Sequence, residues 1–352
     1  MSSSNQYIAC SNCFFDQGLK LNAQALGVES PGRCINCGNE YGKKLTKELL
    51  IQLSHQFFVW GSFHRTKYGG SPIIQFNDRQ QGGQIPFSYP LSLDAKLIEK
   101  LCEIGFFYSG PRLWMIGEIE PLNDLQKKNS RRLIIDRILK EYPTVVLEPG
   151  QLFYRVRKAP SHPENQKEYD SPPFGIGGGG RFGSDNFKVL YGSPNLELCV
   201  HECRFSAEDE LYVATLSATK SLKLLNLSYI LQENVAEFES LDISLHMLFF
   251  AGKHSYKIAR DIAQKAHAEG YDGIVYPSYF SELHTGVMPL RTSYGLSHRI
   301  IPQFSDIESA LSIPNYAIFG DPIEEGKLTV RCINKMIIKK IGYEFHFGPI
   351  IL

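Results

Sequence analysis

The chain has 352 residues, of which 43% are hydrophobic and 21% are charged, a balance that excludes wholesale disorder. Basic and acidic residues both number 37, so the formal net charge of zero gives no overall attraction toward nucleic acid or an anionic membrane. No apolar run approaches the roughly 18 residues of a membrane span, and the first residues lack the basic and apolar regions of a signal peptide. We therefore expect a cytoplasmic protein without a membrane partner, whose eight cysteines are thiols or metal ligands.

Four cysteines near the start of the chain form its most specific local pattern. Twenty residues separate Cys10-x-x-Cys13 from Cys34-x-x-Cys37, which is the spacing of a zinc ribbon. Each C-x-x-C turn presents two thiolates to one side of an ion, and two turns complete a tetrahedron. The pattern predicts a structural zinc in residues 1–43. An iron site of the rubredoxin kind and a redox C-x-x-C are the alternatives, and the few basic residues of the ribbon do not favour a nucleic-acid role.

Residues 44–148 are predicted to be mainly helical. Apolar residues recur at helical spacing in three segments, and a short strand is expected at PIIQF. The three expected helices span residues 44–60, 92–107 and 129–142. This region carries no cluster of titratable groups, which indicates a helper or interaction domain rather than a reaction centre.

Residues 149–352 contain mostly short strand-like runs. They lie at residues 152–157, 187–192, 210–216, 223–227, 273–278, 315–320, 327–333 and 342–347. Two helices are expected among them, one at 193–205 with Ser193 as N-cap and Pro194 at its first position, and one at 255–270 that ends at Gly270. Strands in runs with few helices indicate an α+β domain rather than a doubly wound parallel sheet.

The glycine-rich segment at residues 175–180 formally matches G-x-G-x-x-G. A dinucleotide-binding fingerprint requires a strand before it and a helix after it, whereas here two prolines precede it and a strand follows. We reject that interpretation. The segment is either a flexible loop or a turn that lets the backbone approach a ligand, with Arg181 available to hold a phosphate.

Other catalytic motifs are incomplete. No P-loop sequence is present. His201-Glu202 begins like H-E-x-x-H, but Phe205 stands where the second histidine should be. Arg291 and His298 have the spacing of some helical endoribonucleases, yet the intervening TSYGLS is a poor helix former.

The order of segments in the C-terminal part resembles the RES domain, a family named for an Arg, a Glu and a Ser. The matching segments are YRVR, GRFG, VLYGS, a helix with HE, and GYDGIVYPS. The resemblance covers about residues 150–352, and the layout is similar to members with a four-cysteine ribbon and a helical N-terminal region, including the HEPN/RES type. It implies a fold related to ADP-ribosyltransferase toxins, cleavage of NAD between nicotinamide and ribose, and an antitoxin encoded nearby. By position, it implies three catalytic residues, Arg155, Glu202 and Ser278, and three pocket residues, Gly180, Arg181 and Tyr191. Arg157 and Arg181 are the other candidates for the name-giving Arg.

The chemistry of these residue types fits that reaction. A carboxylate such as Glu202 can stabilise the positive charge that develops on the ribose, and Arg155 or Arg181 can bind a diphosphate bidentately. Tyr191 can stack on a base, and Ser278 can bond an amide or a hydroxyl. Each also has a purely structural interpretation: a surface ion pair for Glu202, a core ring for Tyr191, a turn for Ser278 and a solvent-facing strand position for Arg155.

The sequence therefore favours an NAD-consuming enzyme that acts by hydrolysis, phosphorolysis or transfer of ADP-ribose, as a toxin or effector. The alternative is a protein that is not an enzyme: a zinc-ribbon interaction module whose C-terminal half senses a ligand. A third interpretation, an RNA-targeting toxin, depends only on the ribbon and on the pair Arg291 and His298.

Overall fold

The structure is a computed structural model of the chain. It describes residues 6–65, 70–78, 82–108, 119–173, 175, 180–278, 280–281, 292–293, 296–340, 342, 345 and 347–352. Arg291 and half of the expected strand at 342–347 lie outside the described residues. None of the described helices combines the length and hydrophobicity that crossing a membrane requires.

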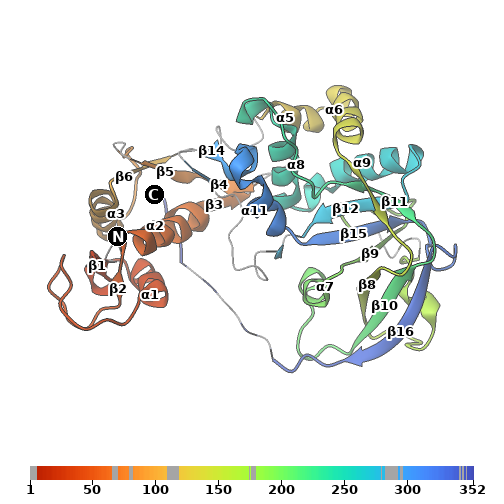
Figure 1. Cartoon of the computed structure of the whole chain (residues 1–352), viewed down its shortest axis with the longest axis horizontal. Helices are drawn as coiled ribbons and strands as arrows, with labels where there is room; N and C mark the ends of the chain where they lie inside the picture. Colours follow the sequence, from red (N-terminus) through yellow and green to blue (C-terminus); the bar gives the residue numbers. More distant parts are fainter. Residues whose placement is uncertain are drawn as a thin grey trace.

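The first part of the chain, residues 6–108, forms an N-terminal unit of short strands and three helices (Figure 1). Its elements are β1 (Ala9–Cys10), α1 (Gln17–Leu26), β2 (Lys44–Leu45), α2 (Lys47–Ser54), β3 (Phe63–Arg65), β4 (Gly70–Pro72), β5 (Ile74–Asp78), α3 (Tyr89–Cys102) and β6 (Ile104–Tyr108). Buried side chains between Ala9 and Phe106 form one continuous core, so the cysteine ribbon packs on the helices that follow it.

Two of the expected helices in this unit differ at their ends. The helix expected at 44–60 begins at Lys47, and its last turns, His55–Val59, are π-helical. The helix expected at 92–107 ends at Cys102, because Glu103 adopts a left-handed conformation (φ 59°) and the following residues pair as β6. Hydrophobic periodicity did not separate the end of this helix from the apolar strand that directly follows it.

Residues 119–336 form a C-terminal unit built on two sheets (Figure 1). Its strands are β7 (Thr144–Leu147), β8 (Leu152–Lys158), β9 (Val189–Gly192), β10 (Leu211–Ala218), β11 (Leu222–Asn226), β12 (Gly273–Pro277), β13 (Thr292–Ser293), β14 (Leu296–Ser297), β15 (Pro314–Phe319) and β16 (Leu328–Met336). The order β16-β10-β8 forms one sheet and the order β7-β11-β12-β15-β9 the other, with β11 and β12 as the parallel pair. Mixed sheets and helices confirm the α+β class.

Helices cover the five-stranded sheet on the face away from the other sheet. They are α5 (Glu120–Gln126), α6 (Lys128–Glu141), α8 (Leu241–Phe250) and α9 (Tyr256–Ala268), while α7 (Leu196–Cys203) packs against β8 and β10, and α11 (Ser305–Ala310) lies before β15. One core lies between the two sheets and a larger one between the sheet and these helices. Of these helices, the sequence predicted α6, α7 and α9 but not α5, α8 or α11. The apolar run of α8 carries no amphipathic period because nearly all of it is buried.

The expected N-cap of α7 was also wrong. Asn195, not Ser193, accepts the hydrogen bond from the Leu198 amide. Ser193 instead forms a β-bridge with Tyr154 through two backbone hydrogen bonds. This long-range pairing keeps Ser193 extended and delays the start of the helix.

The packing divides the chain differently from the predicted boundaries at residues 43 and 148. The core of the N-terminal unit crosses residue 43, and α5 and α6 share the core of the C-terminal unit although they precede residue 148. The predicted three-part division therefore stays a prediction, and the two cores indicate a break between residues 108 and 119.

The end of the chain returns to the N-terminal unit (Figure 1). The side chain of Asn22 exchanges two hydrogen bonds of 3.1 Å with the backbone of Phe347, and the amide of Leu352 donates to the carbonyl of Pro86 at 2.9 Å. Ile351 packs on the core of this unit. The C-terminal segment therefore ties the two units together.

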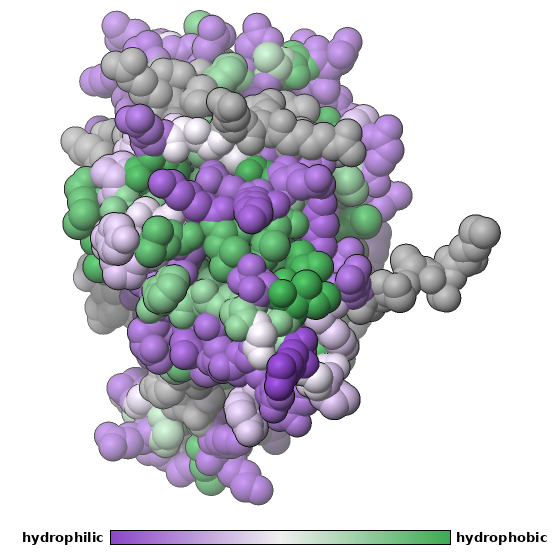
Figure 2. Space-filling view, turned by 90° about the vertical axis from the view of Figure 1, so that its left-hand side faces the viewer, coloured by the Kyte–Doolittle hydropathy of each residue, from purple (hydrophilic) through white to green (hydrophobic). Residues whose placement is uncertain are grey.

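Figure 2 looks onto the side of the molecule that the N-terminal unit occupies. Hydrophobic side chains gather in the middle of this face and polar ones surround them. Exposed hydrophobic residues of this unit include Phe15, Ile35 and Tyr89.

Candidate functional site

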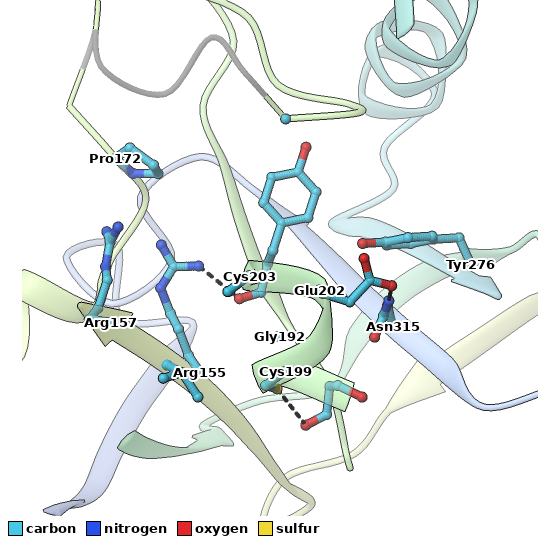
Figure 3. A pocket seen from close by; sticks show the side chains of 13 residues that line it. Arg155, Arg157, Pro172, Gly192, Cys199, Glu202, Cys203, Tyr276 and Asn315 are labelled. Atoms are coloured by element: carbon cyan, nitrogen blue, oxygen red, sulfur yellow. Dashed lines mark hydrogen bonds between the residues drawn. The ribbon is translucent and has the colours of Figure 1, made fainter. Parts of the chain in front are cut away.

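A pocket opens in the C-terminal unit where β8, β9, α7, β12 and β15 meet (Figure 3). Its volume is about 320 Å³, which lies at the lower end of the range for small-molecule sites. The side chains and backbone that line it belong to Arg155, Val156, Arg157, Pro172, Gly180, Tyr191, Gly192, Ser193, Cys199, Glu202, Cys203, Tyr276 and Asn315. Four of the six residues that the sequence analysis assigned to the NAD site are among them.

Arg155 lies on β8 with its guanidinium buried at the pocket wall. Its Nη1 donates to the carbonyl of Tyr191 at 2.7 Å and its Nη2 to the carbonyl of Asp170 at 3.0 Å. Its Nε donates to no described residue. Burial, and then the charge of Arg157, lower the pKa of Arg155 to about 9. The group stays charged at neutral pH, and its charge is poorly compensated.

Arg157 is the second cation on the same strand. Its Nη2 donates to the same Asp170 carbonyl at 2.8 Å, and its Nε donates to the carbonyl of Glu168 at 2.9 Å. Burial lowers the pKa of Arg157 as well. Among the described residues, neither arginine forms an ion pair with a carboxylate. Two adjacent guanidiniums that are held only by backbone oxygens favour an anionic ligand.

Glu202 lies near the end of α7, beside Asn315 (Figure 3), and is held by two hydrogen bonds. The hydroxyl of Ser278, just after β12, and the side-chain amide of Asn315, on β15, both donate to its Oε1 at 2.7 Å. Its Oε2 accepts no hydrogen bond from a described residue. The carboxylate is therefore fixed in orientation and still has one oxygen available to a ligand.

Ser278 meets Glu202 rather than lining the pocket directly. Its hydroxyl donates to the carboxylate and accepts from the amide of Phe280 at 3.1 Å. In this arrangement the hydroxyl proton is not available for the substrate amide or ribose hydroxyl that the sequence analysis considered.

Tyr191 lies on β9 and its ring lines the pocket. Its hydroxyl accepts hydrogen bonds from the amides of Phe182 at 2.8 Å and Gly183 at 3.0 Å. A Cβ atom on Gly180 would lie 2.6 Å from this hydroxyl, so the close approach of the loop requires glycine at that position. Tyr191 therefore fixes the segment that follows the glycine run.

Arg181 points away from the pocket. Its Nη2 donates to the carbonyl of Phe249 at 2.9 Å, and its guanidinium lies over the rings of Phe249 and Tyr256. A cation at the C-terminal end of α8 is stabilised by the carbonyls that end the helix. This arrangement does not bring Arg181 together with the other residues assigned to the NAD site.

The pocket also contains residues that the sequence analysis did not assign to it. Those with side chains able to bind a ligand include Arg157, Cys199, Cys203, Tyr276 and Asn315. Strand periodicity was a usable signal for two of them, because Arg157 follows Arg155 by two positions and Tyr276 precedes Ser278 by two, so each pair shares a sheet face. Burial raises the pKa of both cysteines, and hence neither is an activated thiolate.

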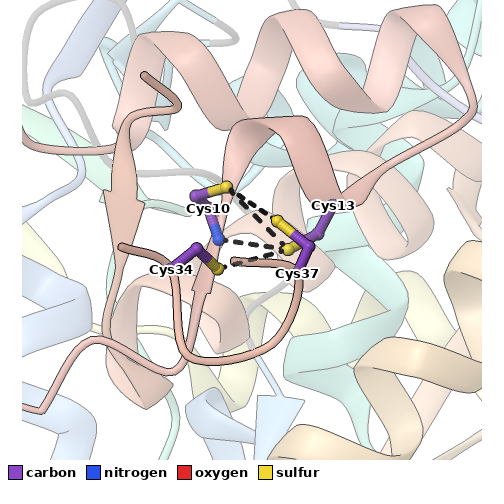
Figure 4. A group of neighbouring side chains, drawn as sticks. All are labelled: Cys10, Cys13, Cys34 and Cys37. Carbon is purple, nitrogen blue, oxygen red and sulfur yellow. Dashed lines mark hydrogen bonds between the residues drawn. The ribbon is translucent and has the colours of Figure 1, made fainter. Parts of the chain in front are cut away.

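The four cysteines of the ribbon converge in the N-terminal unit (Figure 4). Their sulfur atoms all lie within 4.8 Å of one another, and three of the Sγ–Sγ distances are 3.6, 3.6 and 3.9 Å. A tetrahedron with Zn–S bonds of about 2.3 Å has edges of about 3.8 Å. A Cβ on Gly42 would lie 2.7 Å from the sulfur of Cys10, so the backbone closes tightly on the cluster. These residues fit a tetrahedral metal ion.

Residues 152–300 match the family model of the RES domain. The chain contains a RES domain. The match begins at β8 and spans Arg155, Glu202 and Ser278, and it ends at residue 300, whereas the resemblance was expected to extend to about residue 352. The strands β15 and β16, together with α5, α6 and β7, lie outside the match but belong to the same packed unit.

A chain of one solved structure, titled as the crystal structure of the M. tuberculosis MbcT–MbcA toxin–antitoxin complex, is similar to this chain. The two are 12% identical, the alignment covers 58% of this chain and 91% of that chain, and the TM-score is 0.33. A similarity this low supports no conclusion about this chain. No protein in the curated set matches the chain.

Proposed function

We propose that the protein cleaves NAD at the bond between nicotinamide and ribose. The RES domain supports this class of activity, and one observation carries it: a carboxylate held by two donors shares a pocket with the buried Arg155 and the half-buried Arg157, neither of which pairs with a carboxylate of a described residue. The diphosphate of NAD would meet Arg155 and Arg157, and its ribose would meet Glu202.

The proposed chemistry follows from the orientation of Glu202. Loss of nicotinamide leaves positive charge on the ribose, and a fixed carboxylate stabilises that charge without having to reorient during the reaction. Ser278 and Asn315 occupy Oε1, which leaves Oε2 to face the ribose. We assign Ser278 and Asn315 as positioning residues and Glu202 as the group that contacts the reacting atoms.

The acceptor of the ADP-ribose decides which reaction this is. Incubation of the purified chain with NAD, with and without inorganic phosphate, followed by mass spectrometry, distinguishes the three outcomes. Free ADP-ribose indicates hydrolysis, a phosphorylated ADP-ribose indicates phosphorolysis, and a protein of increased mass indicates transfer. Unchanged NAD under all conditions would contradict the proposal and favour the ligand-sensing alternative.

We also propose that the activity is that of a toxin whose partner is an antitoxin. This role follows from the family resemblance. Expression of the chain alone should arrest growth and deplete cellular NAD, whereas the Glu202→Gln variant should do neither. Growth arrest by both proteins at equal expression would contradict it.

For the four-cysteine cluster we propose a structural zinc ion bound by Cys10, Cys13, Cys34 and Cys37. Elemental analysis of freshly purified, reduced protein should find one zinc per chain. Iron in place of zinc would indicate the rubredoxin-like alternative, and the absence of both metals would contradict a metal site.

A further inference from the structure

A buried lysine lies in the ribbon without a carboxylate partner. Lys44 is 2% exposed, and its ammonium group donates to the carbonyls of Asn39 at 3.0 Å and Glu40 at 3.3 Å. Among the described residues, no carboxylate oxygen forms an ion pair with it. Lysine is almost never fully buried unless it is paired, because its charge is costly to remove from water. Its burial therefore calls for a negative charge nearby.

The position of Lys44 relates it directly to the cysteine cluster. Lys44 on β2 is the register partner of Cys10 on β1, so their side chains leave the same face of the two-stranded ribbon. The carbonyl of Asn39 accepts from Lys44 and also from the amide of Cys34 at 2.8 Å. One backbone oxygen therefore connects the ammonium group to the second C-x-x-C turn.

The side chain of Asn39 continues this network to the first turn. Its Oδ1 accepts from Nδ2 of Asn12, which lies between Cys10 and Cys13, at 3.2 Å, and from the amide of Tyr41 at 2.8 Å. The loop that Lys44 holds therefore bridges both halves of the metal site.

The metal-bound cysteines would supply the negative charge that the buried ammonium group of Lys44 requires. Four thiolates and one Zn²⁺ carry a net charge of about −2 in a site where three of the four cysteines are buried. We propose that Lys44 is the internal counter-charge of the zinc–thiolate centre and that its ammonium group keeps the ion bound by holding the loop after the second C-x-x-C turn. This inference rests on the proposed zinc site.

The test compares three full-length variants with the wild type. Lys44→Met removes the charge and keeps an unbranched side chain that is one atom shorter, and Lys44→Arg keeps the charge. Lys43→Met is the matched control, because Lys43 is the adjacent residue but its ammonium pairs at the surface with Glu29 at 2.7 Å. The first readout is the rate at which a chelator removes zinc from each reduced protein.

We expect Lys44→Met to lose zinc about 10- to 100-fold faster than the wild type, the range for removal of an outer-shell partner. Lys44→Arg should retain zinc better than Lys44→Met, and Lys43→Met should match the wild type. Equal rates for Lys44→Met and wild type would overturn the proposal. A wild type without zinc would instead overturn the zinc site itself, so the two failures are distinguishable.

A spectroscopic measurement distinguishes the effect of the Lys44 charge on the metal site from its structural support of the loop after the second C-x-x-C turn. In Co²⁺-substituted protein, loss of a neighbouring positive charge should move the thiolate-to-cobalt charge-transfer band to longer wavelength in Lys44→Met, and Lys44→Arg should restore it. If Lys44→Met does not fold, Lys44→Arg provides the test. We expect the Lys44→Arg protein to have the wild-type charge-transfer band and to lose zinc slowly. Zinc loss from Lys44→Arg as fast as from a Cys34→Ser protein would contradict the proposal.

Discussion

The hydroxyl of Ser278 donates a 2.7 Å hydrogen bond to Oε1 of Glu202, although 76 positions separate the two residues. The end of β12 and the end of α7 meet at this bond. Asn315 approaches the same oxygen from β15, at the same distance. Three elements of the C-terminal unit therefore determine the orientation of one carboxylate.

Loss of either donor should slow the reaction by misorienting Glu202. We expect Ser278→Ala and Asn315→Ala each to lower kcat about 10-fold, the value of one hydrogen bond to a charged group, with little change in KM. Steady-state kinetics of NAD cleavage measure both constants. Because the donors act through Glu202, Ser278→Ala should add nothing in a Glu202→Gln background, and a fully additive double variant would show that Ser278 acts on the substrate itself.

The two arginines of β8 should respond differently to substitution. Arg155→Met leaves the buried carbonyls of Tyr191 and Asp170 with fewer donors, each costing about 1–3 kcal/mol, and should lower the melting temperature. Arg157→Met should mainly raise KM for NAD by about 10-fold, because a diphosphate contact is present in both the ground and the transition state.

Lys158→Met, on the same strand and paired with Asp209 away from the pocket, is the control for both arginines. Thermal unfolding and kinetics on the three proteins check these expectations. An unchanged KM in Arg157→Met would remove Arg157 from the binding site.

Glu237 should make the stability of the C-terminal unit pH-dependent. Burial raises the pKa of Glu237 from 4.5 to about 7, although its carboxylate accepts a hydrogen bond from the amide of Ser297. Because the folded pKa lies above the unfolded one, this group favours folding most below pH 4.5, and stability is lost as the pH rises from about 4.5 to 7.

Glu237→Gln should therefore stabilise the protein by about 3 kcal/mol at pH 8 and by less than about 1 kcal/mol at pH 5. Thermal or denaturant unfolding of both proteins at the two pH values measures the difference. Equal effects at pH 5 and pH 8 would contradict the predicted titration.

The helices before the RES match should be required for its folding. Leu122, Leu125 and Ile138 are completely buried in the core that α5 and α6 share with α8 and α9, and β7 pairs with β11. A protein that begins at residue 119 should be folded and cleave NAD, whereas one that begins at residue 151 should be largely insoluble. Circular dichroism and NAD cleavage compare the two, and an active, folded protein from residue 151 onward would show that α5 and α6 are dispensable.

Local sequence patterns predicted those features of the structure that depend on residues close together in the sequence. The spacing of the cysteines predicted that the four thiols converge, and the strand patterns predicted β8 and β9, on which Arg155 and Tyr191 lie beside the pocket. The roles of these residues stay predictions. The chemistry of its side chain also suggested Glu202 as the carboxylate that stabilises charge on the ribose. In the structure, Ser278 and Asn315 donate hydrogen bonds to this carboxylate.

Long-range contacts determined what sequence reasoning missed. Asn315 reaches Glu202 across 113 positions, and nothing in its own segment marks it as a site residue. Arg181 follows a glycine run in a way that suggested phosphate binding, but its position is set by the end of α8, a helix that periodicity did not reveal. The bridge between Ser193 and Tyr154 likewise displaced the expected N-cap.

The measurement that tests the central claim most directly is nicotinamide release from NAD by wild type, Glu202→Gln and Glu197→Gln. Glu197 lies on the same helix, outside the pocket, with 61% of its side chain exposed, and is the matched control. We predict that Glu202→Gln lowers kcat about 10²- to 10³-fold with little change in KM, because it removes charge at the transition state while keeping shape. Glu197→Gln should match the wild type. A folded Glu202→Gln protein that is as fast as wild type, or a wild type that releases no nicotinamide, would contradict the account.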